Sequence, residues 1–168
     1  MAKDFREYLV EASRSDQFGR VFKELAIGFK VFVSFQASEV HSCTPEETLD
    51  DIYQYTHWEV AMRSTTPPID TPKIGPWMSF RDKEWAEPFD RPEFQRAMVG
   101  EFIPTEHCQQ ILEDCIAYAI EKGHIESEVE IRTVEPDEEV KKTMGCGGCG
   151  SKKKPAKGAK LPEAGAAK

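Results

Sequence analysis

Two histidines and a cysteine are the residues of this chain best suited to chemistry. His41 and Cys43 follow a predicted strand at 29–38, and His57 begins a second one at 57–63. A cysteine next to an imidazole can act as a nucleophile with its base, and the same side chains can bind zinc. The spacing of the three fits no metal-ligand pattern, and polar residues are common at strand ends. A small hydrolase with this Cys/His site is therefore one alternative function.

Cys146 and Cys149 form the one cysteine pair with the spacing of metal ligands, Cys-Gly-Gly-Cys. A tetrahedral zinc site needs two further ligands, and a thioredoxin-type motif needs a βαβ unit with its first cysteine at a helix N-terminus. The sequence around the pair predicts neither. A metal-binding or thiol-redox protein is a second alternative, with zinc as the candidate cofactor if a partner completes the site. Otherwise we expect no cofactor.

The best-marked enzyme motifs are missing from the sequence. It contains no Walker loop, no H-E-x-x-H and no G-x-S-x-G, which removes the enzyme classes that these motifs mark. The five cysteines are an odd number, in a chain whose first residues are charged where a signal peptide is apolar. We therefore expect a non-enzymatic protein with reduced thiols.

Charge is distributed unevenly along the chain. Of 22 basic and 30 acidic residues, eight Lys and one Glu lie from Lys141 onward, so residues 1–140 hold 14 basic and 29 acidic residues and a net charge of −15. Such an acidic body disfavours a nucleic-acid surface and favours basic partners. The lysine run at 152–154, with Lys157 and Lys160, predicts weak contact with nucleic acid by the C-terminal segment alone.

Periodic apolar residues predict the regular elements. Segment 29–38 alternates with one apolar face, formed by Phe29, Val31, Val33 and Phe35, which is typical of a strand with a core side. Segment 57–63 alternates in the same way and is expected to pair with it, and a further strand is predicted at 129–134. Helical spacing predicts helices at 4–12, 15–25, 45–54 and 105–122, with Gly123 ending the last.

Two local signals refine this picture. Thr44-Pro45-Glu46-Glu47 combines a capping Thr, a Pro in the first turn and an acidic residue, which is typical of a helix start. Segment 64–104 holds seven of the eleven prolines, so we expect a long ordered loop there, with a helical turn at 92–98. Large aromatic side chains often anchor interfaces. The aromatic residues of this loop are therefore predicted to contact a protein partner: Trp77, Phe80 and Trp85.

These elements predict an α+β fold. We expect a single small domain at 1–134, with a small, mainly antiparallel sheet packed by helices. Gly, Ala and Lys dominate 135–168, where we expect a flexible, disordered tail. No apolar run is long enough to span a bilayer, so we expect a cytoplasmic protein without a membrane partner.

Two regions also resemble a set of small uncharacterised proteins from tailed bacteriophages and related prophages. They are FQASEVHSCTPEETL with YTHWEVAM, and VGEFIPTEHCQQILEDCIAYAIEKGHI. The residues that carry the resemblance are Ala37, Ser38, His41, Cys43, Pro45, Glu59, Val60, Ile103, Pro104, Gly123 and Ile125. The resemblance implies a phage accessory protein, virion-associated or acting in the host cytoplasm, and it supplies no catalytic residues. A protein that acts by protein–protein interaction is the leading predicted function.

Overall fold

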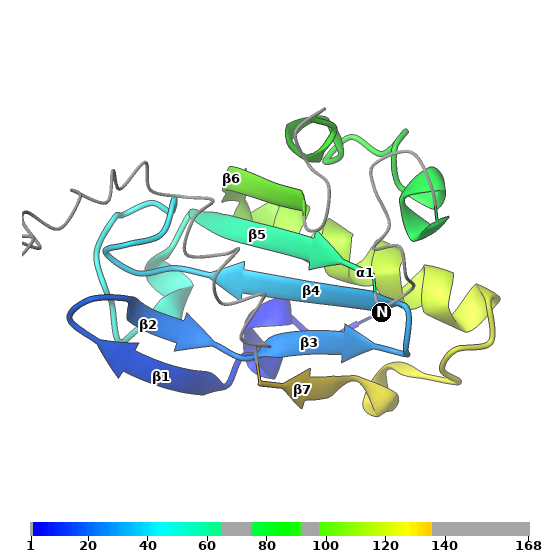
Figure 1. Cartoon of the computed structure of the whole chain (residues 1–168), viewed down its shortest axis with the longest axis horizontal. Helices are drawn as coiled ribbons and strands as arrows, with labels where there is room; N and C mark the ends of the chain where they lie inside the picture. The colour runs from blue at the N-terminus through cyan, green and yellow to red at the C-terminus, as the bar shows by residue number, and fades with distance from the viewer. Residues whose placement is uncertain (1, 65–74, 92–97, 136–168) are drawn as a thin grey trace, which may run out of the picture.

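An antiparallel sheet forms the centre of the fold, and the strand predicted at 29–38 lies in its middle (Figure 1). The structure is a computed structural model and describes residues 2–64, 75–91 and 98–135. The five strands are β3 Glu24–Ile27, β4 Val31–Gln36, β5 His57–Arg63, β6 Met98–Pro104 and β7 Arg132–Val134. They lie in the order β6-β5-β4-β3-β7, and every neighbouring pair is antiparallel.

The two strands predicted at 29–38 and 57–63 pair as expected. Phe35 of β4 lies opposite Val60 of β5, and the apolar face of β4 is buried. The prediction for Phe29 is wrong, because the strand begins only at Val31 and the Phe29 side chain is 55% exposed. Gly28, with a φ of +71°, turns the chain just before it.

Helix α1, Thr105–Glu121, covers one face of the sheet and confirms the helix predicted at 105–122 (Figure 1). Its buried side chains recur at helical spacing: Cys108, Ile111, Leu112, Cys115, Ile116 and Ala119. Gly123 follows with a φ of +71°, a left-handed conformation that glycine adopts easily. Ile125 then packs back into the core. The described chain is a single α+β domain, as predicted.

The helices predicted at 4–12 and 15–25 are wrong. A 3-10 helix, η1 Phe5–Tyr8, is followed by a two-stranded hairpin of β1 Glu11–Ser15 and β2 Gly19–Phe22. Gly19 has a φ of +63° and closes the hairpin turn, where a left-handed residue is favoured. The Gln36 side chain fixes β2, because its Oε1 accepts from the Phe22 N–H (2.9 Å) and its Nε2 donates to the Phe22 carbonyl (2.8 Å). The spacing of apolar residues cannot predict this tertiary contact.

The helix predicted at 45–54 is also wrong. The Thr44–Pro45 peptide is cis, and the helical part of the region is the short 3-10 helix η2, Ile52–Gln54. The Tyr55 hydroxyl bonds backbone groups that a helix would use internally. It donates to the Glu47 carbonyl (2.6 Å) and accepts from the Leu49 N–H (2.7 Å). A partner distant from the cap therefore decides the conformation.

The Pro- and Trp-rich segment folds onto the sheet through two short 3-10 helices, η3 Gly75–Ser79 and η4 Glu87–Phe89. Trp77, Phe80 and Trp85 are 2%, 2% and 1% exposed. Their rings pack on one another and on Phe89, with centroids 5.7 to 6.4 Å apart. This burial contradicts the predicted role of the three side chains as surface anchors, since they are core residues.

The end of that segment and the C-terminal part differ from the prediction in detail. Strand β6 was not foreseen; it lies at a sheet edge, where a terminal proline is tolerated. The strand predicted at 129–134 is shortened to β7 and preceded by a 3-10 helix, η5 Glu128–Glu130. The predicted turn at 92–98, apart from Met98, lies outside the described residues. So do Cys146, Cys149 and the predicted tail beyond Glu135.

Candidate functional site

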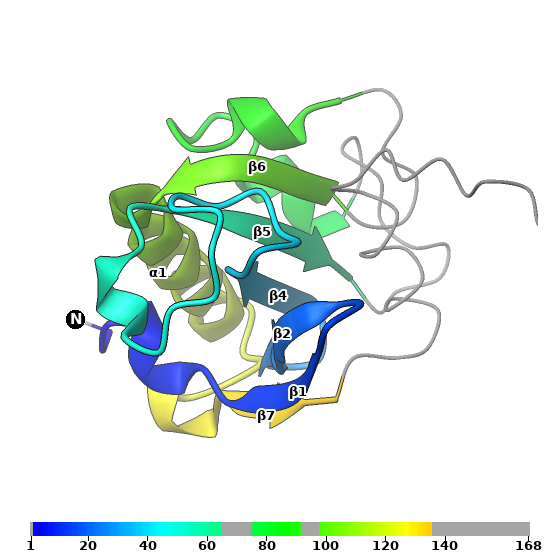
Figure 2. The same cartoon turned by 90° about the vertical axis from the view of Figure 1, so that its left-hand side faces the viewer.

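The residues suited to chemistry meet at one end of the sheet, the end that Figure 2 faces. Strand β4 ends there, β5 begins there and β6 ends there, because the three are antiparallel neighbours. Segment 37–56, here named the acidic loop, closes this end together with the turn between β1 and β2 (Figures 1 and 2). The fold thus gathers the candidate residues of three strands and one loop.

His41 belongs to a tight turn at the start of the acidic loop. Its Nδ1 lies 2.6 Å from the Ser38 Oγ, and its N–H donates to the Ser38 carbonyl (3.1 Å). A Cβ at Gly19 would lie 2.4 Å from the same Oγ, so the hairpin rests directly on this turn. Burial lowers the pKa of His41 to about 4. The imidazole is therefore neutral at neutral pH and is a weak base.

Cys43 is fully buried in the same loop. Its Sγ contacts two carbonyl oxygens, those of Ser38 (3.3 Å) and Pro45 (3.2 Å). Burial raises the pKa of the thiol to about 11, whereas a nucleophilic cysteine needs a lowered pKa. Nδ1 of His57 lies 2.9 Å from the Thr56 hydroxyl. The Cys43 N–H donates to the His41 carbonyl (2.9 Å), but among the described residues no hydrogen bond joins the Cys43 thiol to either imidazole. The geometry therefore gives the predicted Cys/His hydrolase site no support.

Glu59 is a site residue that the sequence named only as part of the phage resemblance and to which it gave no role. It is 2% exposed, and its Oε2 accepts the Ser42 N–H (3.0 Å). The Ser42 hydroxyl donates in turn to Oε1 of Glu101 (3.4 Å). Burial, reinforced by the nearby Glu101 charge, raises the pKa of Glu59. Ser42 therefore joins two carboxyl groups that repel each other when both are ionised.

A β-bulge lies opposite Glu59 on β6. Trp58 pairs with Ile103 and Val60 with Gly100, so Glu101 and Phe102 together oppose the single residue Glu59. Phe102 has a φ of +51°, in the left-handed region where a bulky residue is rare. Its N–H donates to the Ser42 carbonyl (3.0 Å), and its side chain is 44% exposed. The bulge thus holds an aromatic ring outward at a cost in backbone strain.

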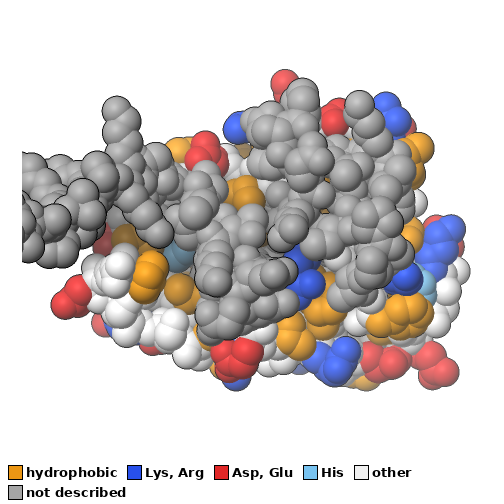
Figure 3. Space-filling model, in the orientation of Figure 1, with side chains coloured by type: hydrophobic (Ala, Val, Ile, Leu, Met, Phe, Trp, Pro, Cys, Tyr) orange, Lys and Arg blue, Asp and Glu red, His pale blue; other side chains and the backbone are white. Residues whose placement is uncertain are grey.

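The acidic loop is strongly negative. It contains no Lys or Arg, and its acidic residues are all exposed: Glu39, Glu46, Glu47, Asp50 and Asp51. Arg14 of β1 approaches Asp50 at 3.7 Å. Glu101 of β6 and Glu106 of α1 add carboxylates at the same end, and acidic side chains are visible there in the space-filling view (Figure 3).

Arg20 fixes the acidic loop against the hairpin. Its guanidinium is 2% exposed and donates to the carbonyls of Leu49 (2.5 Å) and Ala37 (2.9 Å) and to the Tyr55 hydroxyl (3.1 Å). Its Cζ also lies 4.6 Å from the centroid of the Phe22 ring. One buried side chain therefore bonds both the beginning and the middle of the loop.

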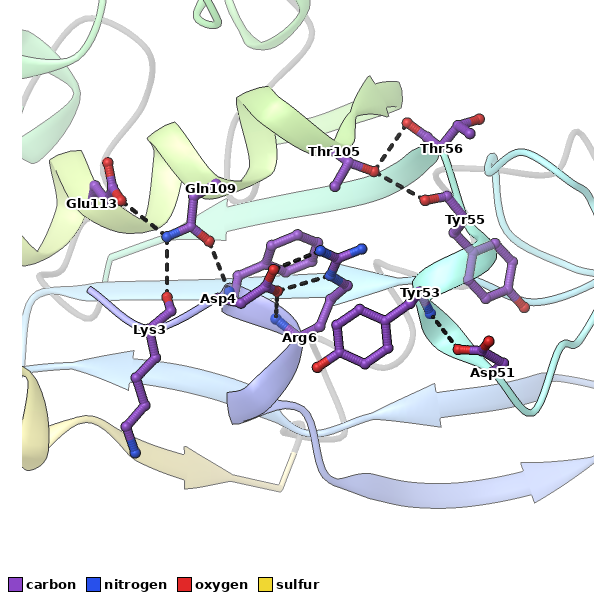
Figure 4. A network of polar contacts seen from close by, with 11 residues as sticks. Lys3, Asp4, Arg6, Asp51, Tyr53, Tyr55, Thr56, Thr105, Gln109 and Glu113 are labelled. Carbon is purple, nitrogen blue, oxygen red and sulfur yellow. Dashed lines mark hydrogen bonds and ion pairs between the residues drawn. The ribbon is translucent and has the colours of Figure 1, made fainter. Parts of the chain in front are cut away.

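N-terminal residues hold the other side of the loop (Figure 4). The Asp4 carboxylate accepts two bonds from the Arg6 guanidinium, from Nε (2.8 Å) and Nη2 (2.5 Å), and these lower the pKa of Asp4. The Arg6 guanidinium in turn lies 4.4 Å from the centroid of the Tyr53 ring. Gln109 of α1 accepts the Phe5 N–H (2.8 Å) and so anchors this segment to the helix.

Comparison with known proteins yields no match to a family model, a curated protein or a solved structure. Within the described ranges, no helix has the length and apolar character needed to cross a bilayer. Nor does the described part of the chain contain a group of three or more His, Cys, Asp or Glu side chains placed to hold a metal ion.

Substituting Glu59 by glutamine is expected to stabilise the protein at neutral pH. Because burial raises the pKa of Glu59, the folded state binds more protons than the unfolded state between the ordinary pKa of 4.5 and the raised one. The contribution of Glu59 to the free energy of unfolding therefore falls as the pH rises through this window. Each unit of difference between the two pKa values corresponds to about 1.4 kcal/mol.

Urea unfolding across this pH window measures the effect. The free energy of unfolding of Glu59→Gln should exceed that of the wild type by an amount that grows as the pH rises through this window. Below the ordinary pKa of Glu59 the two proteins should be equally stable. Glu47→Gln, on the exposed part of the acidic loop, is the control and should run parallel to the wild type. A Glu59→Gln variant that lost stability at neutral pH would show that the fold needs the charged carboxylate.

Proposed function

We propose that the protein is a non-enzymatic accessory protein whose acidic loop binds a basic segment of a partner protein. Phe102 serves as the apolar anchor of this contact. The resemblance to phage and prophage proteins supports a place as a particle component or host-interaction factor, in the virion or the host cytoplasm. A zinc or thiol-redox role of Cys146 and Cys149 stays a prediction.

The conformation of Phe102 is the observation that carries the proposal. A bulky residue at positive φ costs about 1 to 3 kcal/mol, and such strain is concentrated at functional sites. The Phe102 side chain contributes little to core packing, since it is 44% exposed while its neighbour Ile103 is 1% exposed. Bulges also often re-aim a side chain beside a site. A ring held outward is better explained by a partner than by packing.

Charge defines the kind of partner. The exposed acids of the acidic loop are accompanied by no Lys or Arg within 37–56, so a basic partner is attracted and an acidic one repelled. Tyr53, 55% exposed and stacked on Arg6, offers a second aromatic ring at the same loop. Aromatic anchors next to charges of one sign favour a basic segment that also carries apolar side chains.

Phe102→Gly separates this binding role from folding. Glycine adopts positive φ without strain, so the variant should keep its free energy of unfolding within about 1 kcal/mol of the wild type or exceed it. The probe is a fluorescent synthetic peptide of alternating lysine and leucine, with binding followed by anisotropy. Loss of the ring should weaken binding about tenfold, which corresponds to about 1.4 kcal/mol.

Matched peptides and variants sharpen the result. The triple variant Glu39→Gln, Glu46→Gln and Glu47→Gln should bind the same peptide more weakly, and its affinity should depend less on salt. A peptide with glutamate in place of lysine should not bind. Val129→Ser removes another exposed apolar side chain, 84% exposed on η5, and should bind as the wild type does. Equal affinity of Phe102→Gly and wild type for the lysine peptide would refute the proposal.

A further inference from the structure

Four residues on the outer face of α1 are exposed, Glu106, Gln110, Ala117 and Glu121, whereas Glu113 is half-buried and accepts a hydrogen bond from Gln109 Nε2 (3.0 Å). On its inner side the helix contacts the sheet and η1. On one flank Asp114 pairs with Lys83 at 2.8 Å, and on the other Gln109 bonds Phe5 at 2.8 Å. Between these flanks lies a stripe that spans an arc of about 80° on a helix of 3.6 residues per turn. It consists of Glu106, Gln110, Glu113, Ala117 and Glu121.

This stripe is negative along its whole length. Its three carboxylates, Glu106, Glu113 and Glu121, are spaced by about 10 and 12 Å along the axis at a rise of 1.5 Å per residue. Residues 105–121 contain no Lys or Arg. Lys122, just beyond the helix, lies 3.3 Å from Glu121. The negative end of the helix dipole adds to the charge near Glu121, so the stripe favours a partner with several spaced cations.

We propose that the lysine-rich segment 152–160 of the same chain binds this outer face of α1. Lys154, Lys157 and Lys160 recur every third residue. In an extended segment, at about 3.3 Å per residue, they would lie about 10 Å apart, which matches the spacing of the helix carboxylates. Pro155, with its fixed φ, favours an extended backbone. The chain from Lys141 onward carries eight Lys and one Glu, opposite in sign to the rest of the protein.

The segment is long enough to reach the helix. Strand β7 leads to Glu135, the last described residue, and 18 residues, 136–153, lie between it and Lys154. These span up to about 60 Å when extended, whereas α1 is about 25 Å long. A tether of this kind gives an effective concentration in the millimolar range, so weak ionic contacts suffice. A polyanion such as nucleic acid would compete with the helix for the same lysines.

A nitroxide on Cys149 of the full chain, with Cys146→Ser, tests the contact by paramagnetic relaxation enhancement. Cys43, Cys108 and Cys115 are buried, so labelling is directed to Cys149. At about 0.01 M salt, where the Debye length is about 30 Å, the amide signals of Gln110, Ala117 and Glu121 should lose intensity. At about 1 M salt, where it is about 3 Å, the intensity should return.

Charge-neutral variants decide between surfaces. Glu106→Gln with Glu113→Gln and Glu121→Gln should abolish the broadening, whereas the triple glutamine variant of Glu39, Glu46 and Glu47 should leave it unchanged. Broadening centred on the acidic loop, or absent from α1, would overturn the proposal. Mixing isotope-labelled chains without nitroxide and unlabelled chains with it identifies contact between copies, and broadening of α1 in that mixture would also overturn it.

Discussion

Replacing Trp85 by alanine is expected to lower the free energy of unfolding by about 4 kcal/mol. The side chain is 1% exposed and packs on Trp77, Phe80 and Phe89. Its Nε1 donates to Oδ2 of Asp114 (2.7 Å), which joins the segment to α1. The truncation therefore opens a cavity and also leaves Oδ2 of Asp114 without its donor, while Lys83 still pairs with Oδ1. Urea unfolding followed by far-ultraviolet circular dichroism measures the loss.

Met78 provides the matched control within the same segment. It lies one residue after Trp77 but is 51% exposed, so Met78→Ala should change the free energy of unfolding by less than about 0.5 kcal/mol. If Trp85→Ala kept full stability, the aromatic segment would not be part of the core. The side chain would then again be a candidate surface anchor.

Replacing Arg20 by methionine is expected to cost about 3 kcal/mol of stability, although methionine keeps an unbranched apolar stem. The guanidinium is the buried donor to Leu49, Ala37 and Tyr55, and methionine has no donor for these oxygens. The acidic loop should loosen first, because all three acceptors belong to it: two carbonyls and the Tyr55 hydroxyl. Amide hydrogen exchange would show this as faster exchange within 37–56.

Arg14→Met is the control for Arg20→Met. Arg14 lies on the same hairpin, but its side chain is 48% exposed and its ion pairs with Glu11 and Asp50 are on the surface. Such pairs contribute little to stability, so hydrogen exchange of the acidic loop should stay close to that of the wild type. Equal effects of the two substitutions would show that charge, and not the buried bonds, holds the loop.

Strong local periodicity made β4, β5 and α1 predictable. In each, the apolar spacing agrees with the face that the tertiary structure buries, and Gly123 gives α1 a local stop signal. The helix predictions for 15–25 and 45–54 failed for the opposite reason. Segment 15–25 is bonded by Gln36 of β4, and segment 45–54 is bonded by Arg20 of β2 and by the hydroxyl of Tyr55, contacts that apolar spacing does not encode.

The candidate site was only partly visible in the sequence. The region of His41 and Cys43 was singled out for its residue types. Nucleophilic chemistry would require a lowered pKa of the Cys43 thiol and an imidazole next to it, whereas burial raises that pKa. The roles of Glu59 and Phe102 were missed because they depend on the register of β5 with β6. Alternation around Trp58 places Glu59 on the opposite face of the strand, which is the one local hint that the sequence contains.

Backbone amide shifts of the labelled protein, titrated with the lysine–leucine peptide, test the central claim most directly. Binding at the acidic loop predicts saturable shifts that cluster in 38–56 and at Glu101 and Phe102, and that shrink as salt is added. Shifts confined to other surfaces, or the same shifts in Phe102→Gly with unchanged affinity, would contradict the claim that this strained residue and its acidic loop form the binding site.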